Sequence, residues 1–478
     1  MKSKTYRYTG PDEWKSQIGQ TMAYLGYHQG EPAEITVALR RENDAVQLIG
    51  TAGETVYTGQ GRSLDEMRRA LMQWIEEKDG RRKTGWGYLT GVRPVKLVHN
   101  LLDTGVSAAK VIEILRTQYG LADEKADLIA GIAQRQRPYL WTGRLNDERY
   151  RKISYYIGIP YCSSHCIYCS FPSMLIETER SEMLDAFANA LIQDIAEAGR
   201  LAADIGLVPD TLYIGGGTPT CLPLSYLERI LEAVQLHLPD VTEYTVEAGR
   251  PDTADTAVLE ALKAGGVQRI SVNPQTMQQR LLDKIGRRHT VEDIYHMYEE
   301  AKRLGLEVNM DFIAGLPGQT RRDMAENMEI VCQLAPENVT IHTLSLKTGA
   351  PLYHHPMKAE LPPPEDVEGM LRESRDMLKE KGYLPYYGYR QTYMTGNFEN
   401  IGYARPPYWC RYNIQMMEER QTVVGIGPGS STKIVRPDKK LEKVYMPKSI
   451  AAYIADWEKN SRKRRQWMET IYRGGERL

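Results

Sequence analysis

The segment Y-C-S-S-H-C-I-Y-C-S-F at residues 161–171 concentrates the side chains best suited to metal chemistry. It contains Cys162, Cys166 and Cys169, three of the six cysteines in the chain. Thiolates with this C-x₃-C-x₂-C spacing can bind one metal centre, either a zinc ion or an iron–sulfur cluster. A structural zinc site needs a fourth protein ligand, and a [4Fe–4S] cluster is usually held by four cysteines. The pattern therefore leaves three readings open: a cluster with one free iron, a zinc site, or unrelated cysteines.

The rest of the sequence offers no evident fourth ligand. His165 directly precedes Cys166 and is poorly placed to bind the same metal, and Cys221, Cys332 and Cys410 show no paired spacing. We therefore favour a [4Fe–4S] cluster whose fourth iron is open to a substrate or a cofactor.

An alternation of strand and helix patterns begins near residue 152. Short runs rich in β-branched and aromatic residues predict strands at 152–159, 210–214, 243–247, 269–273, 307–313 and 339–346. Apolar residues with helical periodicity predict helices at 180–201, 223–237, 254–264, 291–304 and 321–334. Strands that alternate with helices indicate a parallel sheet, and this number of units fits an open sheet or about three-quarters of a (β/α)₈ barrel.

Residues that could do chemistry lie where these predicted strands end. The cysteine segment follows the first strand, and I-G-G-G-T-P-T (214–220) follows the second. Glu247 closes the third strand and Gln275 lies just past the fourth. Asp311 lies late in the fifth strand and His342 lies within the sixth. Because the carboxyl ends of parallel strands share one edge of the fold, we expect these residues to converge in space.

Length and punctuation divide the chain into three predicted domains, since about 150 residues per domain is typical. Residues 1–150 form an N-terminal α+β accessory domain in which no catalytic constellation is evident. Residues 151–360 form the β/α core. The cluster L-P-P-P at 361–364 leads into residues 361–478, a mixed α/β segment that we expect on the substrate side.

The composition excludes several classes of protein. The chain has 61 Lys and Arg residues against 62 Asp and Glu residues, so broad binding to nucleic acid is not expected. No apolar stretch approaches the ~18 residues of a membrane span, and the N-terminus does not resemble a secretory signal. Few cysteines in a long chain indicate a reducing compartment, so we expect a cytoplasmic protein. The basic run at 462–465 predicts a solvated helix face.

The cysteine and glycine motifs resemble those of the radical SAM superfamily. Its signature is C-x₃-C-x₂-C with an aromatic residue, here Tyr168, before the last cysteine. Over about residues 152–345, the chain resembles the oxygen-independent coproporphyrinogen III oxidase family in Y-I-G-I-P-Y-C, L-Y-I-G-G-G-T-P-T, S-V-N-P-Q, I-G-R-R-H-T and N-M-D-F-I-A-G-L-P-G-Q-T. G-V-R-P at 91–94, G-Y-R-Q-T-Y-M-T-G-N-F-E-N-I-G-Y and Y-N-I-Q-M-M-E-E-R-Q-T resemble its HemZ branch, coproporphyrinogen dehydrogenase. The resemblance implies a partial (β/α)₆ radical SAM barrel.

The resemblance also implies the cofactors and their ligands. Cys162, Cys166 and Cys169 would hold a [4Fe–4S] cluster whose open iron binds S-adenosylmethionine (SAM), which is cleaved to a 5′-deoxyadenosyl radical. The residues implied for SAM binding are Gly215, Gly216, Gly217, Thr218, Glu247, Gln275, Arg287 and Asp311. Arg287 matches the family pattern better than its neighbour Arg288. Catalytic positions are implied for Tyr156 and Glu247.

The implied reaction is anaerobic oxidative decarboxylation of coproporphyrinogen III in heme biosynthesis. Two propionates would become vinyl groups, giving protoporphyrinogen IX and consuming two SAM molecules. An electron donor such as flavodoxin or ferredoxin would be a partner. The alternatives are a cluster-containing heme-binding trafficking protein, or a radical SAM enzyme that acts on another tetrapyrrole.

Two features concern the tetrapyrrole itself. Phe171 stands where the best-understood coproporphyrinogen branch has a further cysteine, and the related heme-chaperone branch also has phenylalanine there. Propionates need cations, for which Arg390, Arg405 and Arg411 are candidates. The eight tyrosines between residues 383 and 412 either line a tetrapyrrole pocket or pack a C-terminal core.

Overall fold

The computed structural model describes residues 4–80, 85–89, 91–391 and 397–474. The chain divides into two compact units. Unit 1 contains residues 1–133 together with the short segment 389–398, and unit 2 contains residues 134–388 and 399–478. The predicted division into three domains remains a proposal.

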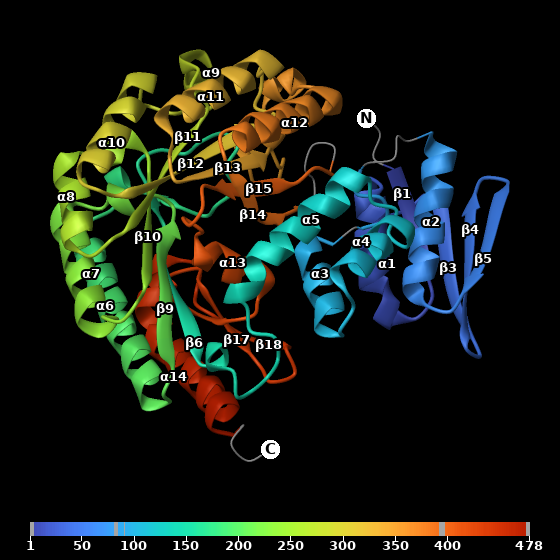
Figure 1. Ribbon diagram of the computed structural model, residues 1–478, viewed down its shortest axis with the longest axis horizontal. Helices are drawn as coiled ribbons and strands as arrows, with labels where there is room; N and C mark the ends of the chain where they lie inside the picture. The colour runs from blue at the N-terminus through green and yellow to red at the C-terminus, as the bar shows by residue number, and fades with distance from the viewer. Residues whose placement is uncertain (1–3, 81–84, 90, 392–396, 475–478) are drawn as a thin grey trace. The chain divides into compact units, whose positions relative to one another are not determined.

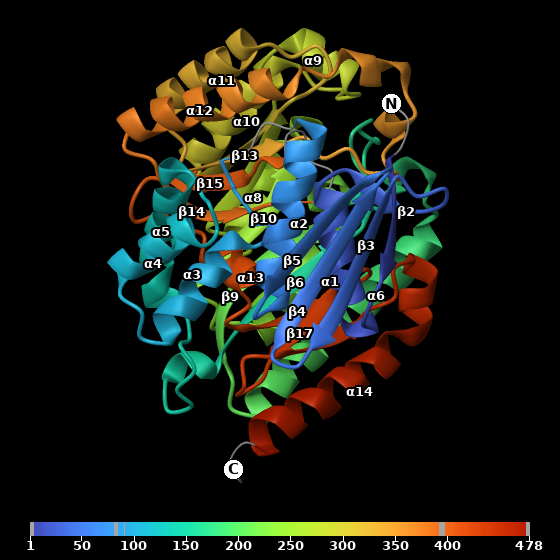
Figure 2. The same ribbon diagram turned by 90° about the vertical axis from the view of Figure 1, so that its right-hand side faces the viewer.

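Unit 1 is built around a five-stranded sheet with the order β2-β1-β3-β4-β5. Its strands are β1 (Lys4–Thr9), β2 (Tyr27–Gln29), β3 (Ile35–Glu42), β4 (Ala45–Ala52) and β5 (Thr55–Gly61). Its helices are α1 (Asp12–Tyr24), α2 (Leu64–Asp79), α3 (Pro94–Asp103), α4 (Ala108–Thr117) and α5 (Asp123–Gln136), the last of which ends in unit 2. Ile35, Val37 and Leu39 alternate along β3 and are buried in one core with Ile18 of α1 and Leu71 of α2. Figure 2 shows the strands of this sheet side by side.

Unit 2 contains an eleven-stranded sheet with the order β14-β15-β13-β12-β11-β10-β9-β6-β16-β17-β18. Its parallel strands are β6 (Lys152–Ile159), β9 (Val208–Gly216), β10 (Glu243–Gly249), β11 (Arg269–Gln275), β12 (Glu307–Ala314), β13 (Asn338–Thr343) and β16 (Thr422–Ile426). The remaining strands are β14 (Leu384–Tyr389), β15 (Asn400–Ala404), β17 (Ser431–Val435) and β18 (Leu441–Tyr445). A separate short pair joins β7 (Tyr161–Cys162) and β8 (Met174–Leu175).

Helices connect the parallel strands and cover the outer face of the sheet (Figure 1). They are α6 (Ser181–Asp204), α7 (Leu224–His237), α8 (Thr256–Ala264), α9 (Gln279–Lys284), α10 (Val291–Arg303) and α11 (Arg321–Leu334). The later helices are α12 (Pro364–Glu380), α13 (Arg411–Glu418) and α14 (Ile450–Gly474). Among the described helices, none combines the length and the apolar character that crossing a membrane requires.

Local sequence explains where several of these helices begin. Thr290 and Thr320 cap α10 and α11, and each accepts a hydrogen bond from the backbone N–H of an aspartate three residues later. The aspartates, Asp293 and Asp323, bond back to the threonine N–H groups and complete two capping boxes. These caps satisfy N–H groups that a helix start leaves without partners.

The predicted fold class is confirmed. The predicted strands correspond to β6 and β9 to β13, which pair in parallel in that order, so the six β/α units are present. The sequence patterns missed β16, which pairs in parallel with β6 and comes from the C-terminal segment. Its sequence T-V-V-G-I is short and has no following helix of the repeating kind, so the pattern gave no reason to add it to the repeat.

Candidate functional site

The carboxyl ends of β6 and β9 to β13 bring together the residues predicted to bind a cofactor. The cysteine loop follows β6, the glycine turn follows β9, and Glu247 lies near the end of β10. Gln275 ends β11, and Asp311 lies in the second half of β12. Because the strands are parallel, these groups share one rim of unit 2.

The cysteine loop is fastened by its backbone on both sides. Within it, the Cys169 N–H donates to the Cys166 carbonyl oxygen at 3.1 Å. The Ile167 N–H donates to the Ile285 carbonyl oxygen at 3.2 Å, and the Leu352 N–H donates to the Ile167 carbonyl oxygen at 2.8 Å. The thiol groups are therefore carried by a loop whose path is set by neighbouring segments.

Two polar groups reach the cysteine sulfurs. The Phe171 N–H donates to Cys169 Sγ at 3.4 Å, and the Thr218 hydroxyl donates to Cys162 Sγ at 3.8 Å. Donors of this kind stabilise a thiolate over a thiol. Thr218 is thereby placed beside a proposed cluster ligand.

The glycine turn needs glycine because the chain passes very close to the cysteine loop. Gly216 has a φ of +122°, which side chains rarely adopt. A Cβ atom on Gly217 would meet the Tyr161 carbonyl oxygen and would lie 2.9 Å from Cys162 Sγ. The turn thus packs directly against the cysteine loop, where the Gly217 N–H donates to the Ile159 carbonyl oxygen at 2.9 Å and the Thr218 N–H donates to the Tyr161 carbonyl oxygen at 2.6 Å.

Glu247 is held by a tyrosine and sits in a setting that favours its protonated form. The Tyr213 hydroxyl donates to Glu247 Oε1 at 2.8 Å. Burial raises the pKa of Glu247 to about 7, and the nearby Asp311 carboxylate acts in the same direction. The hydrogen bonds from Tyr213 and the Gly216 N–H, and the charge of His342, oppose that shift. Such a carboxyl group is poised to bind a cationic or hydroxyl-bearing ligand near neutral pH.

Asp311 is oriented by a chain of polar side chains across neighbouring strands. The Asn309 amide donates to Asp311 Oδ1 at 2.8 Å and to the Ser271 hydroxyl at 2.6 Å. The Thr340 hydroxyl donates to Asn309 Oδ1 at 3.3 Å. His342 Nε2 lies 3.9 Å from the second oxygen of the Asp311 carboxylate. Both carboxylates at the rim therefore have fixed directions.

Gln275 and Arg287 have buried polar atoms that the described protein atoms do not satisfy. Gln275 has a φ of +68°, a left-handed conformation that is unusual for glutamine, and its Oε1 atom has no partner among the described residues. Arg287 donates through Nη2 to the Tyr168 hydroxyl at 3.0 Å, but its Nε and Nη1 atoms find no acceptor within the described parts of the chain. Buried donors and acceptors are normally paired, so these atoms indicate a missing ligand.

Tyr156 stands in a stack of three aromatic rings. Its ring lies 6.4 Å from that of Tyr213 and 6.4 Å from that of Tyr412, and the Tyr213 and Tyr412 rings lie 4.6 Å apart. Burial raises the pKa of the Tyr156 hydroxyl well above its usual value. Tyr156 is therefore a neutral phenol that adjoins the tyrosine that holds Glu247.

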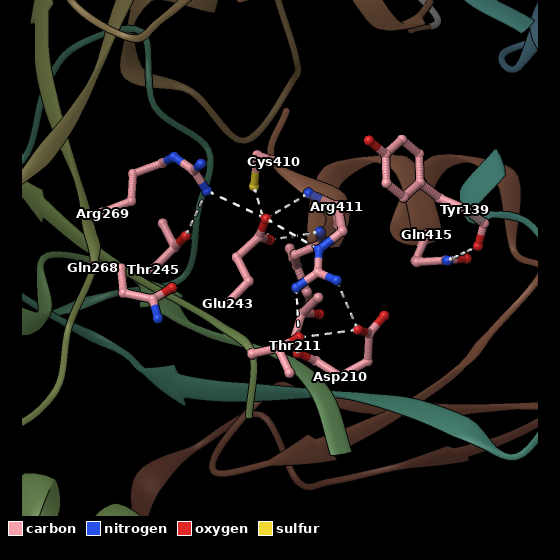
Figure 3. Close-up of polar contacts among 12 residues, drawn as sticks. Tyr139, Asp210, Thr211, Glu243, Thr245, Gln268, Arg269, Cys410, Arg411 and Gln415 are labelled. Carbon is pink, nitrogen blue, oxygen red and sulfur yellow. Dashed lines mark hydrogen bonds and ion pairs between the residues drawn. The ribbon is translucent and has the colours of Figure 1, made fainter. Parts of the chain in front are cut away.

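Arg411 lies at the other end of these strands. It binds Asp210, near the start of β9, at 3.1 Å, and its backbone N–H donates to Glu243, the first residue of β10, at 2.8 Å. Cys410 and Arg269 complete this buried group of charges around Glu243 (Figure 3). The structure therefore does not support Arg411 as a propionate ligand at the rim.

Arg405 and Arg390 are also engaged elsewhere. Arg405 donates to the Ala335 carbonyl oxygen at 2.6 Å, just before β13. In unit 1, Arg390 donates through Nη2 to the Asn397 carbonyl oxygen at 2.8 Å and through Nη1 to the Leu89 carbonyl oxygen. Neither guanidinium group is a supported propionate ligand in this arrangement.

Most of the C-terminal tyrosines that the structure describes pack a core. The buried members of this group are Tyr383, Tyr386, Tyr387, Tyr403 and Tyr412. Tyr383 donates to the Pro336 carbonyl oxygen at 2.5 Å, whereas Tyr389 is half-buried and Tyr408 is exposed at 37%. Tyr393 lies outside the described residues. The five buried tyrosines therefore pack a core, which is the second of the two roles predicted for them.

The basic run on α14 differs from its prediction. Arg462 is exposed, as predicted, but Arg464 is fully buried and pairs with Asp194 at 2.8 Å. The prediction of a solvated face is wrong for Arg464, because Arg464 lies four residues before the buried Met468 and so on the inward face of this helix. Its guanidinium group also donates to the Gly425 carbonyl oxygen at 3.0 Å and so ties α14 to β16.

Comparisons with known proteins agree with this geometry. Residues 156–331 match the radical SAM superfamily. The oxygen-independent coproporphyrinogen-III oxidase-like protein HemZ of Bacillus subtilis (strain 168) is 36% identical over 395 residues, which is 81% of this chain and 77% of that protein. The chain belongs to the HemZ-like branch of the radical SAM superfamily.

Two further relatives place the family in context. The heme chaperone HemW of Bacillus subtilis (strain 168) is 33% identical over 257 residues, 52% of this chain and 64% of HemW. The solved structure of coproporphyrinogen III oxidase (HemN) from Escherichia coli, a radical SAM enzyme, superposes on this chain with a TM-score of 0.53 at 21% sequence identity. It covers 69% of this chain and 73% of HemN, and it supports the shared fold.

Membership of the superfamily implies a [4Fe–4S] cluster and SAM, which sets the zinc alternative aside. The residues present fit both groups. Three cysteines lie on one fixed loop, and the absence of a side chain on Gly217 lets the glycine turn approach Cys162 closely. Within the described residues, no three His, Cys, Asp or Glu side chains are gathered closely enough to hold a single metal ion.

Sequence reasoning missed the residues that support the rim. Tyr213 and Asn309 orient Glu247 and Asp311, yet each looked like an ordinary strand residue. Each lies two positions before a residue predicted to bind SAM, Tyr213 before Gly215 and Asn309 before Asp311. Residues two positions apart on a strand face the same side of the sheet, so this spacing could have indicated them. Asp252, which binds the cysteine loop, carried no such signal.

Proposed function

We propose that this chain is an anaerobic radical SAM oxidoreductase that converts propionate side chains of coproporphyrinogen III to vinyl groups, giving protoporphyrinogen IX. The observation that carries the proposal is the rim itself: three cysteines, a glycine turn, two oriented carboxylates and an arginine with unpartnered donors converge at the strand ends. The similarity to HemZ over 81% of the chain supports the choice of substrate class.

In this proposal each rim residue has a defined task. Cys162, Cys166 and Cys169 hold the cluster, and SAM bound at its open iron supplies hydrogen-atom abstraction. The Gly215–Thr218 turn approaches the methionyl part of SAM with its backbone. The Arg287 guanidinium group binds the SAM carboxylate through its unpartnered nitrogens. Four further residues complete the site.

The four further residues of the proposed site are Glu247, Gln275, Asp311 and Tyr156. The carboxylates of Glu247 and Asp311 bind the amino group and the ribose hydroxyls, and Gln275 Oε1 accepts from an N–H or O–H of SAM. Tyr156 acts as a neutral phenol next to Tyr213 and borders the substrate.

The proposed reaction balances for each propionate. SAM, once bound, would supply the acceptor for one hydrogen atom from the β-carbon and would leave as 5′-deoxyadenosine. The bond to the carboxylate then breaks, CO₂ leaves, and one electron passes to a one-electron acceptor as the vinyl double bond forms. Two propionates therefore consume two SAM molecules. A flavodoxin or a ferredoxin in the cytoplasm would supply the electron that starts each cycle.

The test is anaerobic turnover by the reconstituted chain. SAM, a reductant and coproporphyrinogen III are supplied, and tricarboxylic and dicarboxylic porphyrins are followed by chromatography together with 5′-deoxyadenosine. Two deoxyadenosines per protoporphyrinogen are expected. Release of deoxyadenosine without any decarboxylated porphyrin would refute the proposed substrate. A Cys166→Ala variant serves as the cluster control and is expected to lose the cluster absorbance.

A second candidate function is binding of heme for delivery to another protein. Phe171 on the cysteine loop favours it, because the heme-chaperone branch has phenylalanine at this position, and HemW is 33% identical over 52% of this chain. Stable heme binding by the chain, with no turnover of coproporphyrinogen III, would support this function over the first.

A further inference from the structure

Asp252 lies at the point where two loops of the rim meet. It follows β10 by three positions and accepts a hydrogen bond of 2.9 Å from the Ser163 hydroxyl. It also accepts from Arg250 Nε at 3.1 Å and lies 3.2 Å from His289 Nδ1. One carboxylate therefore contacts the cysteine loop, its own loop and the loop that follows α9.

Arg250 extends the hold on the cysteine loop. Its Nη1 atom donates to the Ser164 carbonyl oxygen at 3.1 Å, while its Nε atom is bound to Asp252. Ser163 and Ser164 directly follow Cys162 and precede Cys166. The pair of Arg250 and Asp252 thus fixes two of the three residues that separate the first two cysteines.

His289 connects the same carboxylate to the loop that carries Arg287. Its side chain is fully buried, and its backbone lies two residues beyond Arg287. Arg287 in turn donates to the hydroxyl of Tyr168, which lies between the second and third cysteines. The cysteine loop and the Arg287 loop are therefore joined twice, once through Asp252 and once through Tyr168.

We propose that Asp252 and Arg250 are positioning residues that hold the cysteine loop in the form that binds the cluster and, through His289, fix the place of Arg287. The proposal rests on cluster ligation by the three cysteines and is independent of the tetrapyrrole. Partners that orient metal ligands typically change metal affinity by about 10- to 100-fold when they are removed. Since the Asp252 side chain is 21% exposed whereas that of Arg250 is 4% exposed, the carboxylate is the gentler position to change.

The experiment compares Asp252→Ala and Asp252→Asn with the unchanged chain after anaerobic reconstitution. Three quantities are measured without turnover: the rate of iron release to a chelator, the midpoint potential of the cluster, and the dissociation constant for SAM. For Asp252→Ala we expect iron release to be about 10- to 100-fold faster, with a shifted potential and weaker SAM binding. Asp252→Asn keeps one oxygen acceptor, so its rate of iron release is expected to lie between that of Asp252→Ala and that of the unchanged chain.

Asp255→Ala is the matched control. Asp255 lies in the same loop and caps α8 by accepting from the Val258 N–H at 3.0 Å, so its loss affects stability without touching the contacts described above. Equal iron release and equal potential in Asp252→Ala and Asp255→Ala would overturn the proposal. If Asp252→Ala does not fold, the decision falls to Asp252→Asn, which must release iron faster than the unchanged chain. A Cys166→Ala variant that retained its cluster would instead refute the assignment of the ligands.

Discussion

The Tyr213 hydroxyl donates a 2.8 Å hydrogen bond to the Glu247 carboxylate, and both side chains come from neighbouring parallel strands. The tyrosine fixes one oxygen of a carboxyl group whose pKa burial raises to about 7. The pair is therefore a binding group that gains its charge in the neutral range.

SAM affinity is expected to depend on the ionisation of Glu247. As pH rises through about 7, Glu247 ionises and SAM binds more tightly. Glu247→Gln should bind SAM more weakly above that range and should lose much of the pH dependence. Isothermal titration of SAM between about pH 6 and pH 8 measures this. Since Asp311 and His342 face the same carboxyl group, a pH dependence that survives in Glu247→Gln would assign it to them instead.

The same group should lower the stability of the ligand-free protein at high pH. Below the unfolded pKa of 4.5, Glu247 is protonated in both states, and between there and about 7 the unfolded state ionises first. Stability is therefore lost as pH rises through this window. At about 1.4 kcal/mol per pKa unit, the upper limit for the loss of unfolding free energy is about 3 kcal/mol. Solvent screening of the partly buried side chain makes the actual loss smaller.

Glu247→Gln is consequently expected to unfold at higher denaturant concentration than the unchanged chain at about pH 8 and not at about pH 4. Denaturant titrations of unit 2 fluorescence or circular dichroism at both pH values provide the measurement. A variant that is less stable than the unchanged chain at the higher pH would contradict the raised pKa.

Arg287 and its neighbour Arg288 offer a matched test of the carboxylate site. Arg287 has two unpartnered buried nitrogens, whereas Arg288 is 59% exposed and pairs with Glu177 at 3.1 Å. Arg287→Lys loses the planar fork that binds a carboxylate through two bonds, so SAM should bind at least about tenfold more weakly. Arg288→Lys should bind SAM normally. Both should keep their cluster absorbance, and equal SAM affinities in the two variants would exclude Arg287 as the ligand.

The sequence predicted the rim because its signals are local. A strand pattern followed by glycines or by one carboxylate at its end indicates both the element and the place of the residue, as for Gly216, Glu247 and Asp311. The predicted bounds of β6 and α11 match those of the structure. Nothing local indicates which strand pairs with β6 on the side away from β9, so β16 was not predicted.

Contacts between distant segments explain the other differences. Arg411 looked available because its partners Asp210 and Glu243 lie some 170 to 200 positions earlier. Arg464 looked solvated because its partner Asp194 lies on α6. Charge runs report composition, while burial depends on which helices pack together, and that is a property of the whole fold.

Arg464 should be important for stability. Its ion pair with Asp194 has both side chains fully buried, and Tyr453 also donates to Asp194 at 3.0 Å. Arg464→Met leaves that carboxylate without its cation, which should cost about 3–5 kcal/mol of unfolding free energy. Arg462→Met, on the exposed side of the same helix, should change stability by less than about 0.5 kcal/mol. Urea denaturation of both variants measures the difference, and equal midpoints would contradict the burial of Arg464.

Asn309 should control SAM affinity without contacting SAM. Its amide donates to Asp311 at 2.8 Å, and a hydrogen bond to a charged group contributes about 1.5–3 kcal/mol. Asn309→Ala should therefore weaken SAM binding about tenfold as Asp311 loses its fixed direction. Ser271→Ala removes another partner of Asn309 and leaves the bond to Asp311 in place, so it should have a smaller effect. Calorimetric titration of SAM distinguishes the two, and an unchanged affinity in Asn309→Ala would remove Asp311 from the SAM site.

Phe171 offers a test of the tetrapyrrole that is separate from the cluster. Its backbone N–H donates to Cys169 Sγ, but its side chain is 41% exposed beside the loop. Phe171→Ala keeps the backbone donor, so iron content and SAM affinity should not change. If the ring packs on a porphyrin, its loss removes about 1.5–3 kcal/mol of apolar contact, or roughly ten- to a hundredfold in affinity.

Met174→Ala is the control for that measurement, because Met174 is also apolar and 49% exposed and lies in β8, three positions along the same loop. Binding of heme and of coproporphyrin, a stable analogue of the substrate, is titrated to both variants by absorbance. Weaker binding of either porphyrin to Phe171→Ala alone would place the tetrapyrrole at the cysteine loop. Weaker binding of coproporphyrin alone would favour the decarboxylase, and weaker binding of heme alone would favour the heme carrier. Unchanged binding of both would move the tetrapyrrole away from Phe171.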